Sequence, residues 1–131
     1  MIVSLHVATG AAGGALVRSR SGALLLGFAL HGLGDAVPHH DVESQGFEIG
    51  SGGMALLALA ARYGPFHPVT IGALAASAPD VEHVLPLPRP GGRKLFPSHR
   101  VEGWHRDGGL PAWVQLAAAG TILAVLLSRR R

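Results

Sequence analysis

Residues 2–17 read IVSLHVATGAAGGALV, an apolar run with glycine at positions 10, 13 and 14 and with no Asp, Glu, Lys or Arg. Small residues at this spacing allow two helix backbones to approach closely in a bilayer. No basic residue precedes the run, whereas a cleaved signal peptide begins with one. We therefore expect a helix over residues 2–17 that is retained as the first membrane helix.

Four further apolar stretches follow, and prolines, glycines or arginines separate them. They cover residues 23–37, 51–63, 69–78 and 110–127. Only the last approaches the ~20 residues of a standard span, so the shorter ones require a thinned bilayer or an interfacial position. The polar segment 79–109 is rich in Pro, Gly and Arg and is expected to form a long loop. We predict an all-α fold, a small polytopic membrane bundle of four to five short helices in one domain over residues 1–131.

The composition favours a membrane protein over a soluble or nucleic-acid-binding one. Hydrophobic residues make up 48% of the chain and charged residues only 15%, which is unusual for a soluble domain. The net charge of +3 comes mainly from arginines at the ends of apolar runs, where they anchor a chain at lipid headgroups. Cysteine is absent, so thiolate metal sites are excluded. Membrane lipids are the expected partners, nucleic acid is not, and a homo-oligomer is left open.

Helices that cross the membrane in alternating directions would place most histidines on the same side. If all five stretches cross the membrane, seven of the eight histidines fall on one side, and only His67 falls on the other. Arg18, Arg20, Arg62 and the C-terminal arginines would make the His67 side cytoplasmic by the positive-inside rule. The long loop carries almost as many basic residues, so the orientation is left open.

Most histidines of that shared side stand next to acidic residues. Imidazole and carboxylate together are the ligand set of zinc, manganese and non-haem iron. His31 and Asp35 are four residues apart and share one face of a helix. Alone, they would do no more than satisfy each other's hydrogen bonds. The residues after Pro38 strengthen a metal or catalytic interpretation, and they are His39, His40 and Asp41.

A second acidic group follows the fourth apolar stretch. Asp80 and His83 are spaced i, i+3, so they either bind a metal or position water, or solvate the start of a loop. His6 joins the predicted metal ligands because it falls on the same side. An enzyme built on these residues would use metal-activated water. Asp41 or Glu82 would then act as the general base.

Four motifs lie along residues 1–106. They are a histidine near the start of the first helix (His6), a His-x-x-x-Asp-x-x-x-His helix end (His31, Asp35, His39), a Gly-Ala-Leu segment leading into Pro-Asp (residues 72–83) and a His-Arg stretch ending in His (residues 99–105). They resemble the motifs of a family of membrane-bound metal-dependent hydrolases of bacterial inner membranes, with Glu82 in place of the family's second Asp. The resemblance implies hydrolysis with a divalent ion, and the ligand types favour zinc, with manganese or iron as alternatives. A site at the membrane surface favours a lipid-like or phosphoester substrate.

A second, weaker resemblance concerns the segment His31-Gly32-Leu33-Gly34-Asp35. It is similar to the His-x-x-Gly-Asp segment of zinc-dependent phospholipase C and related nucleases, which are also helical. Three hypotheses follow from the sequence. The first is a membrane-bound metal-dependent hydrolase, and the second is a non-enzymatic membrane protein that binds or transports a metal ion or a proton-coupled solute. The third is a soluble or peripheral bundle whose histidines satisfy buried contacts.

Overall fold

A computed structural model describes residues 1–129, and this part of the chain is all-helical, which confirms the predicted all-α class. Short helical turns connect the last two long helices, and they are η1 (Ala78–Asp80), α5 (Val81–Val84), η2 (Pro90–Gly92) and α6 (Pro97–Arg100). The bundle itself consists of α1 (Val3–Val17), α2 (Arg20–Ala36), α3 (Gln45–Tyr63), α4 (Pro68–Ser77) and α7 (Ala112–Ser128).

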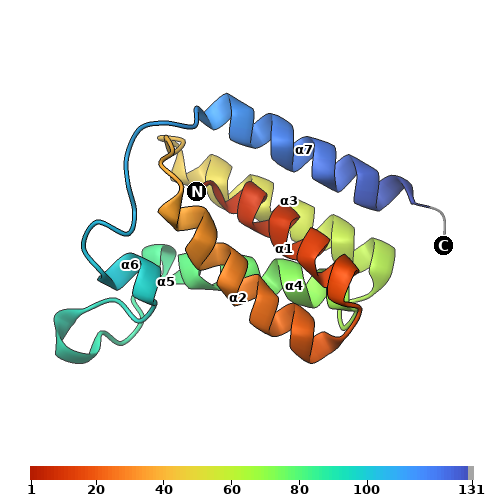
Figure 1. Cartoon of the computed structure of the whole chain (residues 1–131), viewed down its shortest axis with the longest axis horizontal. Helices are drawn as coiled ribbons and strands as arrows, with labels where there is room; N and C mark the ends of the chain where they lie inside the picture. The colour runs from red at the N-terminus through yellow and green to blue at the C-terminus, as the bar shows by residue number, and fades with distance from the viewer. Residues whose placement is uncertain (130–131) are drawn as a thin grey trace.

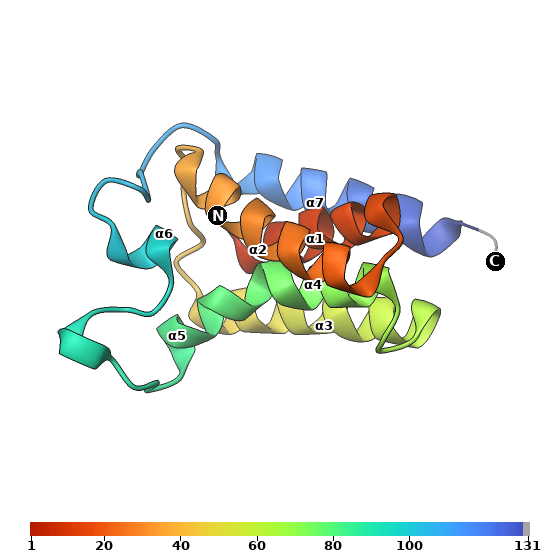
Figure 2. The same cartoon turned by 60° about the horizontal axis from the view of Figure 1, so that its bottom comes forward.

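Helix α1 lies at the centre of the bundle and contacts each of the other four long helices (Figure 1). The segment between α4 and α7 extends beyond one end of the bundle, where α5 and α6 lie (Figure 2). The N-terminus lies at this same end of the bundle. Helix α7 also begins at this end and runs towards the opposite one. The ends of α2 and α4 and the starts of α1, α3 and α7 are therefore gathered beside the long connecting segment.

Local capping explains where the helices begin. Ser19 and Ser44 precede α2 and α3, and each hydroxyl accepts a hydrogen bond from a backbone N–H three residues later. Pro68 occupies the first turn of α4, where its missing N–H has no helical partner to lose. The cap at Ser44 corrects one predicted boundary, because α3 begins at Gln45 rather than near residue 51. Its first turn contains Glu48, which the apolar pattern could not include.

Close packing between α1 and α4 depends on glycine. A Cβ built on Gly72 would lie 2.3 Å from the Gly10 carbonyl oxygen, and one built on Gly14 would lie 2.1 Å from the Pro68 carbonyl oxygen. Both contacts are with backbone atoms, which cannot move aside as a side chain does. The expected close approach at Gly10 and Gly14 is thus confirmed, with α4 as the partner helix.

Gly72→Ala is therefore expected to destabilise the fold, because the added methyl group forces α1 and α4 apart. Overpacking of this kind costs about 1–3 kcal/mol of unfolding free energy. Gly50→Ala in α3 is the matched control, since nothing lies within 4 Å of its Cβ position, and it should stabilise the helix by about 0.5–1 kcal/mol. Unfolding followed by circular dichroism measures both. Equal stability of the two variants would contradict the close contact.

Across residues 1–129, none of the helices combines the length and the hydropathy that crossing a bilayer requires.

Candidate metal centre

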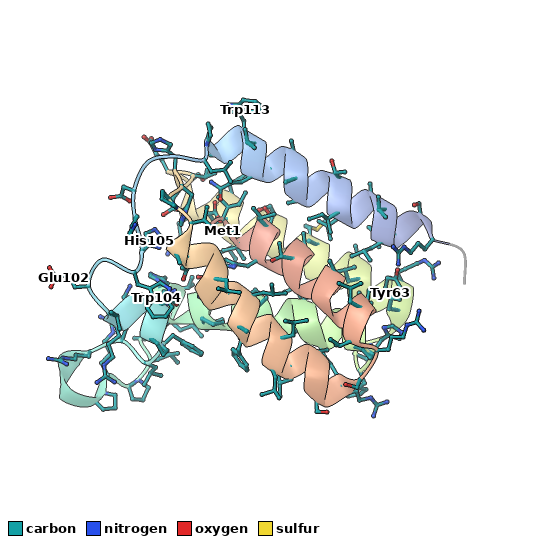
Figure 3. All side chains as sticks on the ribbon, viewed as in Figure 1. Met1, Tyr63, Glu102, Trp104, His105 and Trp113 are labelled. Carbon is teal, nitrogen blue, oxygen red and sulfur yellow. The ribbon has the colours of Figure 1, made fainter. Side chains whose placement is uncertain are left out.

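The candidate site lies at the end of the bundle that carries the long connecting segment. Figure 3 labels Met1, Trp104 and His105 at this end and Tyr63 at the other. Residues from four separate elements converge here because the helices alternate in direction. They are His6 from α1, His31 and Asp35 from the last turns of α2, Asp80 from η1 and His99 from α6.

Three buried side chains form a nearly equilateral triangle of ligand atoms. The Nε2 atoms of His31 and His99 are 3.2 Å apart. The Oδ2 atom of Asp35 lies 3.0 Å from the first and 3.3 Å from the second. The side chains of His31, Asp35 and His99 are each no more than 3% exposed. These three atoms therefore face one another in a space that bulk water hardly reaches.

The outer nitrogen of each ring fixes its tautomer. His31 Nδ1 donates a hydrogen bond of 2.8 Å to the Ala76 carbonyl, and His99 Nδ1 donates one of 2.6 Å to Glu82 Oε1. In the neutral form of each ring, Nε2 must then carry a lone pair rather than a hydrogen. Two lone pairs and a carboxylate oxygen that converge in a buried space repel one another. A metal ion or a proton among them would relieve this repulsion.

The separations match those of a metal site. When a zinc ion binds its ligands tetrahedrally at about 2.0–2.1 Å, the ligand atoms lie about 3.3 Å from one another. The observed sides of 3.0, 3.2 and 3.3 Å fall close to this value. In the described part of the chain, Asp35 Oδ2 also lacks any hydrogen-bond partner, although it is buried. A single ion could thus contact all three atoms without rearrangement of the chain.

Two further side chains flank the triangle. His6 Nε2 lies 3.1 Å from the other oxygen of Asp35, and its ring stacks on that of His31 with 4.2 Å between centroids. Asp80 Oδ1 is 3.7 Å from His99 Nε2. Its Oδ2 is buried and has no hydrogen-bond partner among the described residues. Burial raises the pKa of Asp80 to about 6.

Without a metal ion, the carboxylates of Asp35 and Glu82 favour a proton on His99. Burial lowers the pKa of His99, but the neighbouring Asp35 carboxylate and the hydrogen bond to Glu82 outweigh burial and raise the pKa above its ordinary value. Glu82 itself stays ionised. Burial raises its pKa, yet hydrogen bonds from the Leu95 N–H and from His99 bring it below the usual range.

A second histidine–carboxylate group lies beside the first. His39 Nε2 is 3.1 Å from Asp41 Oδ1, and His105 Nε2 is 3.4 Å from Asp41 Oδ2. The amino nitrogen of Met1 contacts His39 Nε2 and lies 3.2 Å from Asp35 Oδ1. Burial lowers the pKa of His39, but its hydrogen bonds to Asp41 and to the Val37 carbonyl raise the pKa above its ordinary value.

One cavity of about 360 Å³ reaches both groups. Asp35, Asp80 and His99 line it from the buried side, and Asp41 and His105 line it from the side nearer solvent. The side chains of Asp41 and His105 are 54% and 36% exposed. The cavity therefore connects the buried triangle with the surface of the protein.

The structure corrects three of the expected roles. His40 is exposed and lies outside the His/Asp/Glu groups among the described residues. His83 is also exposed, and its ring packs against that of His99 with 4.3 Å between centroids. Its Nδ1 contacts Lys94 Nζ at 3.1 Å, and it belongs to none of the ligand groups of the described residues. Glu82 is not placed as a general base, because one oxygen binds His99 Nδ1 and the other accepts the Leu95 N–H at 2.7 Å. It positions His99 from the side that faces away from the triangle.

The remaining predicted residues lie in two places instead of one. His31 and Asp35 belong to the triangle, His6 and Asp80 flank it in groups that share His31, and His39 and Asp41 belong to the neighbouring group. Two histidines that the sequence interpretation did not count as ligands, His99 and His105, each complete one of the groups. The signal available for them was their position on the shared histidine side, just before the last apolar stretch.

No known protein family, curated protein or solved structure matches this chain. The resemblances to membrane-bound metal-dependent hydrolases and to zinc-dependent phospholipase C thus stay predictions.

Proposed function

We propose that the protein is a metal-dependent hydrolase in which His31, His99 and Asp35 hold a divalent ion, zinc before manganese or iron. The observation that carries the proposal is the triangle of ligand atoms, whose two histidine nitrogens present lone pairs to a buried carboxylate. His6 supports the site by its contact with the second oxygen of Asp35. Three protein ligands leave an ion with an open position for water, as in catalytic zinc sites.

The reaction follows from what lines the cavity. A bound divalent ion lowers the pKa of a water ligand towards ~7 and polarises a phosphoryl or carbonyl oxygen. Asp80 lines the cavity with its Oδ1 3.7 Å from His99 Nε2, so it would accept the proton of the attacking water. As the water oxygen bonds to phosphorus or carbon and the ester bond breaks, that proton would pass to the leaving alkoxide. The products would be an acid and an alcohol.

A membrane location is the second part of the proposal, and the distribution of charge supports it. The middle of every long helix lacks Asp, Glu, Lys and Arg, so charged residues gather at the two ends of the bundle. Large apolar side chains are exposed along its sides, including Leu16 (81%), Leu25 (71%) and Met54 (70%). A surface of this kind is stable against lipid acyl chains and not against water. The cavity then opens at the level of the headgroups, which favours a lipid-like phosphoester.

Metal content and hydrolysis, measured together on purified protein, test the catalytic part. We expect one or more equivalents of zinc after incubation with zinc and removal of the excess, measured by mass spectrometry. We also expect hydrolysis of bis(4-nitrophenyl) phosphate that a chelator abolishes and added zinc restores. Absence of any bound metal under these conditions would overturn the proposal. It would leave a proton as the cation of the triangle, in line with the non-enzymatic alternative.

Carbonate washing of membranes tests the proposed location. A bundle whose apolar sides contact acyl chains stays in the membrane pellet at high pH, whereas a protein held by charge alone is released. We expect the full chain to stay in the pellet and to require detergent for extraction. Release into the carbonate supernatant would contradict the membrane location while leaving the metal site intact.

Glu82→Gln should weaken zinc binding without removing any ligand. The neutral amide is a poorer acceptor for His99 Nδ1, so the ring becomes less basic and less firmly oriented. Loss of such an outer partner usually costs about 10–100-fold in metal affinity. Glu102→Gln is the control, because Glu102 points away from the bundle in the same connecting segment (Figure 3). Competition with a zinc chelator of known affinity gives both values, and unchanged affinity in Glu82→Gln would remove the positioning role.

A further inference from the structure

The group formed by His39, Asp41 and His105 has no part in the reaction described so far. Its three ligand atoms, one from each residue, all lie within 4.8 Å of one another. Its chemistry repeats that of the triangle, since two imidazole nitrogens face one carboxylate. His39 Nδ1 donates to the Val37 carbonyl at 2.6 Å, so neutral His39 also presents a lone pair at Nε2.

Asp35 lies between the two groups and offers one oxygen to each. Its Oδ2 belongs to the triangle with His31 and His99. Its Oδ1 lies 3.2 Å from the amino nitrogen of Met1, and this nitrogen in turn contacts His39 Nε2 and is 3.9 Å from Asp41 Oδ1. The Met1 nitrogen thus lies between Asp35, Asp41 and His39. Two carboxylate oxygens and an imidazole nitrogen that face one space form a donor set that suits a divalent cation.

We propose that the cavity holds two divalent ions, an inner one in the triangle and an outer one bound by His39, Asp41 and His105, with the Asp35 carboxylate between them. The inference rests on the proposed function and extends it from one ion to two. Paired metal ions stabilise the attacking and the leaving oxygen of a phosphoester at the same time. The second ion therefore favours phosphoesters among the substrates of the proposed hydrolase.

The two sites differ in exposure, which predicts different behaviour. The inner ligands are almost completely buried, whereas Asp41 and His105 are open to solvent at the cavity mouth. Water competes for the outer ion and stabilises it after release. The outer ion should consequently exchange faster and bind more weakly than the inner ion.

The test is a titration of the full-length chain with zinc at graded free concentrations, with bound metal counted by mass spectrometry. We expect two equivalents in two separate steps. His105→Ala should remove the weaker binding step and keep the tighter one, because His105 lies on the solvent-exposed side of the cavity. His40→Ala is the matched control, since this exposed histidine adjoins His39 in sequence but contributes to neither group. His99→Ala should show the reverse pattern, with loss of the tighter step.

The outcomes separate this inference from the proposed function. One equivalent that is lost in His99→Ala and unaffected by His105→Ala would overturn the second site and leave the hydrolase proposal in place. No bound zinc in any form would overturn both. His39→Ala adds a second check on the outer site, and thermal unfolding of each variant shows whether the fold is retained. Loss of both steps in His105→Ala with a retained fold would also contradict two distinct sites.

Discussion

Asp35→Asn is expected to abolish stoichiometric zinc binding and, with it, hydrolysis. Asp35 supplies the only carboxylate oxygen within 3.3 Å of both His31 Nε2 and His99 Nε2 in the described residues. Asparagine has nearly the same shape but no charge, and its NH₂ group can donate hydrogen bonds to the two nitrogens in place of an ion. Removal of a group that only hydrogen-bonds to a metal ligand costs about 10–100-fold in metal affinity. The loss of a direct ligand should exceed 100-fold.

The same substitution should also weaken the metal-free fold. The buried Asp35 carboxylate lies 3.0–3.3 Å from nitrogens of His6, His31 and His99, and loss of one member of a buried charge-paired group destabilises a protein. Thermal unfolding with and without zinc therefore gives a clear pattern. Zinc should raise the unfolding temperature of the wild type and leave that of Asp35→Asn unchanged. Asp107→Asn, at an exposed position nearby, is the control. Wild-type zinc affinity in Asp35→Asn would exclude Asp35 from the ligand set.

Helix direction explains why part of this site could be predicted from the sequence. Five apolar stretches that alternate in direction place the start of the first beside the ends of the second and fourth. His6, Asp35 and Asp80 occupy these positions, and the structure brings them together. This reasoning requires only the order of the elements, so it holds whether the bundle lies in lipid or in water. His67, at the start of α4, lies at the opposite end as expected.

The choice between neighbouring residues could not be predicted in the same way. Residues 38–40 pair with the segment 106–110 through backbone hydrogen bonds, among them His39 N–H to the Arg106 carbonyl. Successive side chains of an extended chain point to opposite sides. His39 therefore points inward and His40 outward. The sequence alone does not indicate which of these two adjacent histidines faces the site. The position of His99 depends on the fold of a long segment without periodicity, where tertiary contacts such as those with Glu82 and Asp35 fix its place.

Asp80→Asn is expected to reduce hydrolysis strongly while zinc stays bound. Asp80 lies outside the triangle, so His31, His99 and Asp35 still hold the ion. The amide cannot accept the proton of the attacking water, and loss of a general base costs about 10²–10⁴-fold in rate. Glu43→Gln is the matched control, because Glu43 is an exposed acid that lines the same cavity.

The pH profile separates a general base from a structural carboxylate. Asp80 accepts a proton only when it is ionised, and its pKa in the metal-free protein is about 6. A nearby metal ion favours the ionised form and lowers this pKa further. The kcat/KM of the wild type should thus fall as the pH decreases below about 6, and this acidic limb should be absent from the residual activity of Asp80→Asn. A variant that loses zinc together with activity would instead make Asp80 a ligand. A variant with full activity would assign the proton transfer to another group of the cavity.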